Sequence, residues 1–290
     1  MIAAADLGGH TLTAGLVESG RVLRKKTVPT PPPRTPETVC AALAALLAEL
    51  ETGDAPLLLG VPGMVLDGRA VGCCPNLNGW NGLTDRALGE LTGRETRLAN
   101  DCDCAALGEM RGGAARGLKD FVFCALGTGV GGAVIVGGRL VRGRRGRTGE
   151  IGHFPLLEDR GCGCGGRGHV ESFFSADVLE RAGEKYGYGR DMKKLWEQRE
   201  NAWLARPFAE GLRALACAFT TLTHLLDPEA IVVGGGLSHL DGLLDDLRDY
   251  MQPLLSPVYR PGPEMRLARL GEDAPLLGAE VLWAEVHPNG

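Results

Sequence analysis

The 290-residue sequence has no apolar run approaching the roughly 20 residues that a helix needs to cross a bilayer. A secretory signal is also lacking, because the opening run MIAAADLGGH is short and reaches an acid at Asp6. We therefore expect a cytoplasmic protein without a membrane partner. Basic charge is not in excess, since the formal net charge is -5. A nucleic-acid partner is not expected, because neutralising phosphates needs a concentrated basic surface.

Two common nucleotide-binding fingerprints are missing. No G-x-G-x-x-G opens a helix with an acid about twenty residues further on, and no G-K-S/T occurs. These absences exclude a standard dinucleotide site and a P-loop. A disulfide framework is not expected either, because nine cysteines without a secretion signal indicate free thiols, some of which can serve a metal site.

Strands, glycine-rich turns and helices recur in both halves of the chain. Apolar runs predict strands at 2–9, 11–19 and 20–30, and Thr35, Pro36 and Glu37 predict the start of a helix. The segment 119–141 predicts two strands around a glycine-rich turn, and the apolar stripe of 205–227 predicts a long helix. The recurrence indicates two α/β domains of related design, with a boundary near Gly112.

Three glycine-rich turns follow apolar runs, at 6–11 (DLGGHT), 126–132 (LGTGVGG) and 233–238 (VGGGLS). Glycine lets backbone amides approach a phosphate closely, and converging amides supply partial positive charge. Polar partners accompany two of the turns, namely Asp6, Thr11 and Thr128. Phosphate binding is the favoured interpretation, and the alternative is a hairpin that needs glycine only for positive φ.

The segment 94–104 predicts a strand that runs into a loop, and Asn100 and Asp101 lie at the end of that strand, where the loops of α/β proteins commonly carry functional sites. A carboxylate in this place could accept the proton of an attacking hydroxyl. Asp103 is the competing candidate for that role. A purely structural alternative, in which the Asn-Asp pair caps a helix, stays open on the local sequence.

The segment 149–171, GEIGHFPLLEDRGCGCGGRGHVE, holds four metal-ligating side chains. His153, Cys162, Cys164 and His169 suit a tetrahedral zinc ion, and the intervening glycines allow the backbone to wrap closely around it. The alternative is a flexible loop with two incidental thiols. The spacing favours zinc.

Taken together, these motifs resemble the ROK family of sugar kinases and related repressors, within the actin-like, hexokinase-like ATPase superfamily. The resemblance runs nearly end to end, and GEIGH at 149–153 followed by CGCG at 162–165 is its most specific part. The other matching segments are DLGG at 6–9, PNL at 75–77 with Trp80, Asn100-Asp101, LGTGVGGAV at 126–134, DPEAIVVGGGLS at 227–238 and LLGAEVLW at 276–283.

The resemblance implies a two-domain α/β fold of the actin-like, hexokinase-like (ribonuclease H-like) kind with an interdomain cleft. The small domain would span 1–112, with a helix at about 275–290 packing back on it, and the large domain would span 113–274 and carry the zinc loop. Relatives of this kind are commonly dimers or tetramers, so a homodimer or homotetramer is expected.

The implied activity is an ATP-dependent transfer of the γ-phosphate to the 6-hydroxyl of a hexose, with glucose as the first expectation. Asp101 would be the catalytic base. The implied sugar contacts are Gly63, Asn76, Asn100, Asp101, Glu150, His153 and Glu171. Alternatives are a kinase for an N-acetylhexosamine, allose or fructose, or a sugar-binding member without catalysis. A sugar-sensing repressor would carry an added N-terminal helix-turn-helix domain, which we do not expect before the Asp6 turn.

The implied cofactors are ATP, Mg²⁺ and a structural Zn²⁺. Asp6 would help to place the magnesium ion, and the metal ligands of the family pattern would be His153, Cys162 and Cys164. The phosphates and adenosine would contact Gly8, Gly9, Thr11, Gly127, Thr128, Gly129, Gly131, Gly234, Gly235 and Gly236.

Two positions depart from the family pattern. His10-Thr11 stands where the family usually has Thr-Lys, so the first phosphate loop lacks its lysine and the preferred phosphoryl donor is open. His169 stands where the family has the last cysteine of the metal motif. Histidine still binds zinc, and replacing a thiolate by a neutral ligand makes the site less negative by one charge. We expect zinc to be retained.

Overall fold

The computed structural model describes residues 1–74 and 77–287. The described chain forms two compact units. Unit 1 comprises Met1–Gly117, Leu140–Thr148 and Arg269–Gly290, and unit 2 comprises Leu118–Arg139 and Gly149–Ala268. The domain boundaries expected at 112 and 274 stay predictions. No helix among the described residues is long and apolar enough to cross a membrane.

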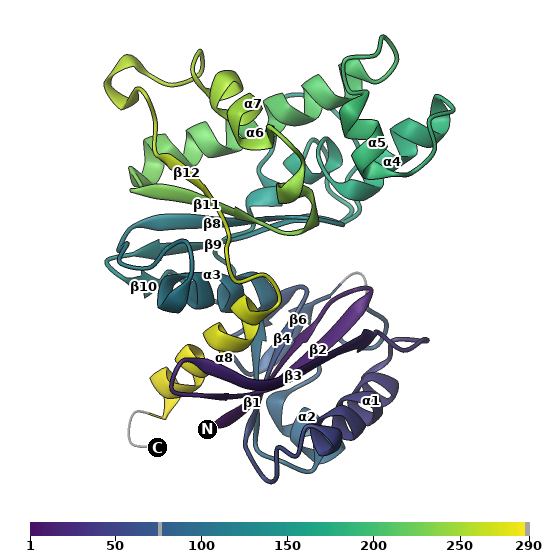
Figure 1. The fold of residues 1–290 in the computed structure, drawn as a ribbon, viewed down its shortest axis with the longest axis vertical. Helices are drawn as coiled ribbons and strands as arrows, with labels where there is room; N and C mark the ends of the chain where they lie inside the picture. Colours follow the sequence, from purple (N-terminus) through teal and green to yellow (C-terminus); the bar gives the residue numbers. More distant parts are fainter. Residues whose placement is uncertain (75–76, 288–290) are drawn as a thin grey trace. The chain divides into compact units, whose positions relative to one another are not determined.

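Unit 1 is built on a five-stranded sheet of order β3-β2-β1-β4-β7 (Figure 1). β1 pairs antiparallel with β2 and parallel with β4, so the predicted N-terminal strands are found. The strands are β1 (Ile2–Leu7), β2 (Thr11–Glu18), β3 (Arg21–Pro29), β4 (Leu57–Val61) and β7 (Thr96–Asn100), with β5 (Met64–Leu66) and β6 (Ala70–Cys73) in a separate hairpin. The helices are α1 (Pro36–Glu49), α2 (Asp85–Thr92), α3 (Asp101–Gly112) and α8 (Asp273–Val286).

The helices of unit 1 begin where the sequence supplies a suitable first turn. α1 starts at Pro36 after Thr35, as predicted, although the Thr35 side chain makes no capping hydrogen bond. α3 starts directly at Asp101, and the Asn100 side chain accepts a hydrogen bond from the Asp103 amide at 3.0 Å. The prediction of a loop running from the β7 strand to Cys104 was therefore wrong. The capping interaction satisfies a helix amide that would otherwise lack a partner, so the helix forms without an intervening loop.

Unit 2 repeats the topology of unit 1. Its sheet has the order β10-β9-β8-β11-β12, in which β8 pairs antiparallel with β9 and parallel with β11. The strands are β8 (Phe121–Leu126), β9 (Val130–Val136), β10 (Arg139–Leu140), β11 (Ala230–Gly234) and β12 (Glu264–Leu267). The helices are α4 (Ala176–Lys185), α5 (Met192–Glu197), α6 (Ala205–Leu226) and α7 (Leu243–Met251), with short 3-10 turns η1 (Ile151–His153), η2 (Val170–Ser172), η3 (Gly236–His239) and η4 (Pro257–Tyr259).

The core of unit 2 forms between its sheet and α6. Phe208, Leu215 and Phe219 lie on one side of α6 and are buried, as the predicted stripe requires. They pack in one cluster with residues of β8 and β11, including Val122 and Ile231. The buried cluster holds the sheet in place beneath the loops that follow its strands.

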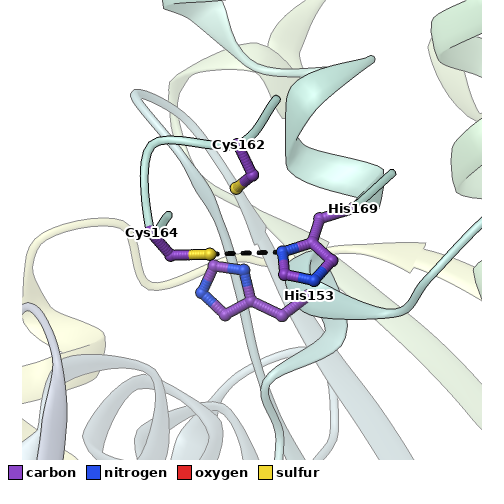
Figure 2. A group of neighbouring side chains, drawn as sticks. All are labelled: His153, Cys162, Cys164 and His169. Atoms are coloured by element: carbon purple, nitrogen blue, oxygen red, sulfur yellow. Dashed lines mark hydrogen bonds between the residues drawn. The ribbon is translucent and has the colours of Figure 1, made fainter. Parts of the chain in front are cut away.

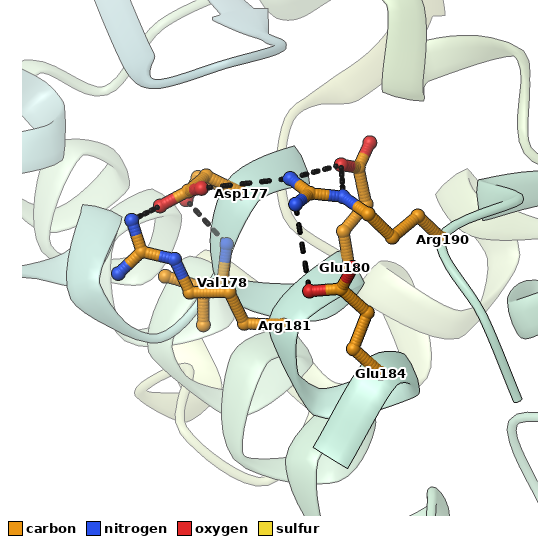
Figure 3. A network of polar contacts seen from close by, with 7 residues as sticks. Asp177, Val178, Glu180, Arg181, Glu184 and Arg190 are labelled. Atoms are coloured by element: carbon orange, nitrogen blue, oxygen red, sulfur yellow. Dashed lines mark hydrogen bonds and ion pairs between the residues drawn. The ribbon is translucent and has the colours of Figure 1, made fainter. Parts of the chain in front are cut away.

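The surface of α4 carries a network of ion pairs (Figure 3). Arg190 lies 3.0 Å from Glu180, 3.4 Å from Glu184 and 4.0 Å from Asp177, and Arg181 lies 2.7 Å from the same Asp177. These side chains are largely exposed, so each pair contributes about 0.2–1 kcal/mol at most. The network ties the turn after α4 back to the helix and takes no part in the candidate site.

α3 and α8 of unit 1 pack with their backbones in direct contact. A Cβ atom added at Gly108 of α3 would lie 1.9 Å from the Ala274 carbonyl oxygen of α8. A Cβ atom added at Gly278 of α8 would lie 1.7 Å from the Cys104 carbonyl oxygen of α3. Each helix therefore needs glycine where it meets the other, and no side chain separates them.

The first prediction concerns this contact. Gly108→Ala should lower the free energy of unfolding by about 3 kcal/mol or more, because the added methyl group meets immobile backbone. Urea unfolding measures the change. Gly112→Ala is the control, since Gly112 lies in the same helix with no atom within 4 Å of an added Cβ. Equal stability of the two variants would contradict the close packing of α3 against α8.

Candidate functional site

Two acidic residues of unit 1 lie beside Gly60 of β4. Asp6 lies near the end of β1, and Asp101 is the first residue of α3 after β7. A Cβ atom added at Gly60 would lie 3.4 Å from Asp6 Oδ1 and 3.7 Å from the Asp101 Cα atom. The ends of three neighbouring parallel strands thus bring together two acids that are 95 residues apart in the sequence.

Asp6 is held in an environment that disfavours its charge. Its Oδ1 atom is shielded from solvent and has no hydrogen-bond partner among the described residues. Burial, with smaller contributions from the charges of Asp101 and Glu272, raises the pKa of Asp6 to about 7. A divalent cation next to this carboxylate would replace the proton and neutralise the neighbouring acids, so the group fits a magnesium ligand.

Asn100 connects the start of α3 to Gly63. Its Oδ1 accepts from the Asp103 amide, and its Nδ2 donates to the Gly63 carbonyl at 2.9 Å. Gly63 adopts a φ of 152°, and an added Cβ would lie 2.3 Å from the Cys73 carbonyl oxygen. Asn100 therefore caps α3 and is also hydrogen-bonded to Gly63, another predicted sugar contact. Asn76, a further predicted sugar contact, lies outside the described residues.

The first glycine turn of unit 1 is held by hydrogen bonds at its base. Gly8 donates to the Thr11 carbonyl at 2.8 Å, and its own carbonyl accepts from Thr30 Oγ1 at 2.8 Å. Gly9 has no atom within 4 Å of an added Cβ and does not have positive φ. Neither the backbone conformation nor local packing requires glycine at this position. A ligand surface at this turn stays a prediction.

In unit 2, two of the predicted nucleotide-binding turns lie side by side. Gly234 of β11 pairs in register with Ala125 of β8, so the turns that follow these strands are neighbours. Gly235 has a φ of 83°, and an added Cβ would lie 2.4 Å from the Leu126 carbonyl oxygen. Gly127 and Gly236 have no atom within 4 Å of an added Cβ and do not have positive φ. Gly127 lies in the turn of the β8–β9 hairpin, and its conformation does not require glycine; Gly235 is glycine because of a close backbone approach. Nucleotide binding at these turns stays a prediction.

The remaining residues predicted for these turns are placed as follows. Thr128 is exposed at the tip of the β8–β9 turn, and Gly131 is half-buried in β9. A Cβ atom added at Gly129 would lie 2.3 Å from Glu171 Oε2, and this oxygen accepts from the Val130 amide at 2.9 Å. Glu171 is thereby attached to the β8–β9 turn, a link that the sequence did not indicate.

The GEIGH segment packs against β9 through its two glycines. A Cβ atom added at Gly149 would lie 2.4 Å from the Gly132 carbonyl oxygen, and one added at Gly152 would lie 2.1 Å from the Val130 carbonyl oxygen. Ile151 between them is completely buried. The segment is fixed by backbone contact, and this gives Glu150 and His153 defined positions. Glu150 directly precedes η1, His153 is its last residue, and both are half-buried.

The four predicted metal ligands come together (Figure 2). The candidate ligand atoms of His153, Cys162, Cys164 and His169 all lie within 4.8 Å of one another. Cys164 Sγ lies 3.3 Å from His169 Nδ1. Ligands around a tetrahedral zinc ion lie about 3.3–3.8 Å apart, so a shift of about 1 Å would close the site. The donor set of two thiols and two imidazoles fits zinc.

His153 stands at the edge of this cluster with its two ring nitrogens in different surroundings. Nε2 lies 3.7 Å from Glu150 Oε2. Nδ1 is buried and has no hydrogen-bond partner among the described residues, which leaves it available to a metal ion. Burial, with the neighbouring Cys164 and Glu171, raises the pKa of the Cys162 thiol, so a bound metal would have to displace its proton.

Two acids near the site have no counterpart among the sequence predictions. Glu272 contributes to the raised pKa of Asp6. Glu109 is completely buried in α3, and its carboxylate accepts backbone hydrogen bonds from distant residues. A charged residue on an otherwise apolar helix surface was the available signal for Glu109. Glu272 carries no comparable local pattern.

The two sheets have the same strand order, and each begins with an antiparallel hairpin whose turn is rich in glycine. These features define the class of the protein. It is a two-unit ATPase-type fold of the actin-like, hexokinase-like kind, as predicted. The chain belongs to the ROK family, whose sequence pattern matches residues 2–286. The resemblance stated from the motifs is thereby confirmed.

Individual relatives match over nearly the whole chain. The glucokinase of Thermotoga maritima is 34% identical, with 97% of this chain and 96% of the relative covered. An N-acetylmannosamine kinase of Haemophilus influenzae is 30% identical, with 95% and 93% covered. The crystal structure of a ROK family glucokinase from Streptomyces griseus, in complex with glucose and AMPPNP, superposes with a TM-score of 0.82 at 32% identity and covers 97% of this chain and 98% of its own.

The second prediction tests the electrostatics of Asp6. Because its pKa is about 7 in the folded protein and 3.8 ordinarily, the folded protein keeps a proton that the unfolded chain releases between these values. Stability of the wild type should therefore fall as the pH rises from about 4 to 7 and level off above. Asp6→Asn should remove this fall, so its advantage over the wild type should grow by about 2–3 kcal/mol between pH 5 and pH 8.

Urea unfolding at pH 5, 6, 7 and 8, without magnesium or nucleotide, measures this difference. Asp54→Asn, on an exposed turn of the same unit, is the control and should follow the wild type. A difference between Asp6→Asn and the wild type that is the same at every pH would contradict the raised pKa.

Proposed function

We propose that the protein is an ATP-dependent sugar kinase that transfers the γ-phosphate to the 6-hydroxyl of an aldohexose, with glucose as the preferred acceptor. The observation that carries the proposal is the meeting of Asp6 and Asp101 beside Gly60, in a chain of the ROK family. Phosphoryl transfer needs a cation, a base at the acceptor and aligned phosphates more than it needs covalent chemistry. Asp6 supplies a ligand for the cation, and Asp101 supplies the base.

Asp101 is the catalytic base of the proposed reaction. It takes the proton of the sugar hydroxyl as the hydroxyl oxygen bonds to the γ-phosphorus and the bond from that phosphorus to ADP breaks. It lies in the first turn of α3, at a helix N-terminus that carries partial positive charge. Asp6 holds the magnesium ion, which neutralises charge on the phosphates when bound.

The sugar contacts of the proposal come from both units. Asn100 and Gly63, linked by a hydrogen bond, contribute from unit 1 together with Asn76. Glu150, His153 and Glu171 contribute from unit 2, where the GEIGH segment and the β8–β9 turn fix their backbones. Carboxylates and imidazole accept and donate hydrogen bonds to hydroxyl groups, so these residues suit a polyol.

Nucleotide phosphates bind at the glycine turns of the proposal. Gly8, Gly9 and Thr11 serve from unit 1, and Gly127, Thr128, Gly129 and Gly131 serve from unit 2. Gly234 to Gly236 line the adenosine. The open surfaces at Gly9, Gly127 and Gly236 support this assignment, since a side chain there would occupy space that no protein atom uses. The first turn has no lysine, so its backbone amides alone carry that contact.

A structural zinc ion is part of the proposal. His153 Nδ1, Cys162, Cys164 and His169 bind it, with His169 in the place of the family's last cysteine. Two thiolates and two neutral imidazoles leave the site without net charge. A zinc ion bound at Nδ1 would fix the tautomer of His153 and leave Nε2 beside Glu150, 3.7 Å from its Oε2 atom. The ion orders the sugar pocket and has no part in phosphoryl transfer.

A second candidate acceptor is an N-acetylhexosamine. The similarity to an N-acetylmannosamine kinase, at 30% identity, is nearly as strong as the similarity to a glucokinase. An acetamido group changes the acceptor at one ring position, and a pocket distinguishes it by shape and by one or two contacts. The catalytic residues of the proposal are the same for both acceptors.

The third prediction tests the catalytic base. Asp101→Asn should lower kcat with glucose by about 10³-fold, because an amide cannot accept the proton, and should change glucose affinity less than about threefold. Coupled measurement of ADP release gives kcat, and calorimetry gives the affinity. Asp103→Asn is the matched control, since Asp103 lies in the same helical turn and was the competing candidate. Loss of activity in Asp103→Asn with retention in Asp101→Asn would reverse the assignment.

The fourth prediction tests the metal site. Metal analysis should find about one zinc ion per chain in the wild type and in His169→Cys, and much less in Cys164→Ser. Loss of zinc frees the loop that bears Glu171, so the KM for the sugar should rise about 10-fold or more. Cys217→Ser, in α6 and outside the cluster, should keep both values. Absence of zinc from the wild type would disprove the site.

A further inference from the structure

Glu109 is a completely buried acid in the last turns of α3. Its carboxylate accepts three backbone hydrogen bonds. Oε2 accepts from the Ala114 amide at 2.6 Å, and Oε1 accepts from the Arg269 and Leu270 amides at 2.9 and 2.8 Å. A buried carboxylate is unfavourable unless both oxygens are hydrogen-bonded, and here both are.

The three donors lie next to the first and the last of the four places where the chain passes between the units. Ala114 precedes the first passage, which follows Gly117, and Arg269 is the first residue of unit 1 after the last passage. One side chain therefore holds the first and the last connection, and its partners there are about 155 residues apart in the sequence. Gly113 leaves room for it, since an added Cβ would lie 2.0 Å from Glu109 Oε2.

The same helix carries the proposed catalytic base. Asp101 opens α3, and Glu109 follows eight residues later, a distance of about 12 Å along a helix. Gly108, directly beside Glu109, is in backbone contact with α8. α3 is therefore a fixed element, with Asp101 at its start and Glu109 near its end. The hydrogen bonds of Glu109 hold the two neighbouring connections at a set position relative to Asp101.

We propose that Glu109 is a positioning residue for phosphoryl transfer, which fixes the first and the last of the four connections between the units to the helix that bears Asp101. This inference rests on the proposed function. In the productive reaction the sugar 6-hydroxyl oxygen bonds to the γ-phosphorus, ADP leaves and Asp101 takes the hydroxyl proton. When the connections are not held, water takes the place of the sugar oxygen, and the products are ADP and inorganic phosphate.

Glu109→Gln is the first test. All three partners are backbone N–H donors, and both oxygens of Glu109 accept from them. Glutamine has only one side-chain oxygen, so its NH₂ group must face at least one of these donors, and that hydrogen bond is lost. We expect kcat for glucose phosphorylation to fall about 10-fold, with the KM for glucose within about threefold of the wild type. The number of ATP molecules hydrolysed per glucose phosphorylated should rise at least about fivefold. A loss of folded protein would lower both rates equally and leave this ratio unchanged.

Gly113→Ala and Gly112→Ala form a second, matched pair. The methyl group in Gly113→Ala displaces the Glu109 carboxylate without changing its chemistry, whereas Gly112→Ala meets open space. Only Gly113→Ala should raise the hydrolysis ratio. Glu229→Gln is a further control, because Glu229 accepts from the Lys119 and Asp120 amides at 2.7 and 3.0 Å but lies outside α3. It should leave the ratio unchanged.

Two results separate the inference from the proposed function. If the wild type phosphorylates a hexose and the ratio is unchanged in both Glu109→Gln and Gly113→Ala, the positioning role is overturned and the kinase assignment stands. If the wild type phosphorylates no hexose, both are overturned. A raised ratio in Glu109→Gln and Gly113→Ala, with Gly112→Ala and Glu229→Gln unchanged, is the result that we expect.

Discussion

The backbone contact between α3 and α8 is the constraint on which the candidate site depends. Gly108 and Gly278 each lie against a carbonyl oxygen of the opposite helix, so neither helix can turn or slide without a clash. This fixes α3, and the start of α3 in turn places Asp101 beside Gly60 and Asp6. Glu109, at the other end of the helix, joins the same rigid element to the first and the last of the four connections with unit 2. The proposed base and the proposed positioning residue are thus parts of one mechanical unit.

The acids proposed for the site lie in different environments in the two units, and each environment fits the proposed role of its acid. In unit 2, Glu171 accepts a hydrogen bond from the Val130 amide, which holds it in one orientation. In unit 1, Oδ1 of Asp6 is shielded from solvent without a partner among the described residues, and its pKa is raised to about 7. When such a buried carboxylate is ionised and has no partner, it lowers the stability of the protein, and a bound cation would remove this cost. Glu171 suits the orientation of a neutral sugar, whereas Asp6 suits a metal ion that arrives with the nucleotide.

Much of this arrangement could be predicted because it is encoded locally. The strands of both sheets, the glycine turns and the cluster of His153, Cys162, Cys164 and His169 each occupy a short stretch with a recognisable pattern. Other features depend on residues that are distant in the sequence. The partners of Glu109 are up to 161 residues away. Segment 140–148 groups with unit 1, where Arg142 pairs with Glu285 at 2.5 Å. The early start of α3 at Asp101 was missed because a cap and a catalytic loop share the same residues, Asn and Asp.

The central claim is that Asp101 and Asp6 support transfer of the γ-phosphate of ATP to a sugar 6-hydroxyl. Phosphorus NMR of the wild type with ATP, magnesium and either glucose or N-acetylmannosamine tests it most directly. The account predicts a phosphomonoester resonance coupled to the protons on C6, formed in equal amount with ADP, and faster with glucose. Formation of inorganic phosphate alone, or of a phosphate ester at another position of the sugar, would contradict it.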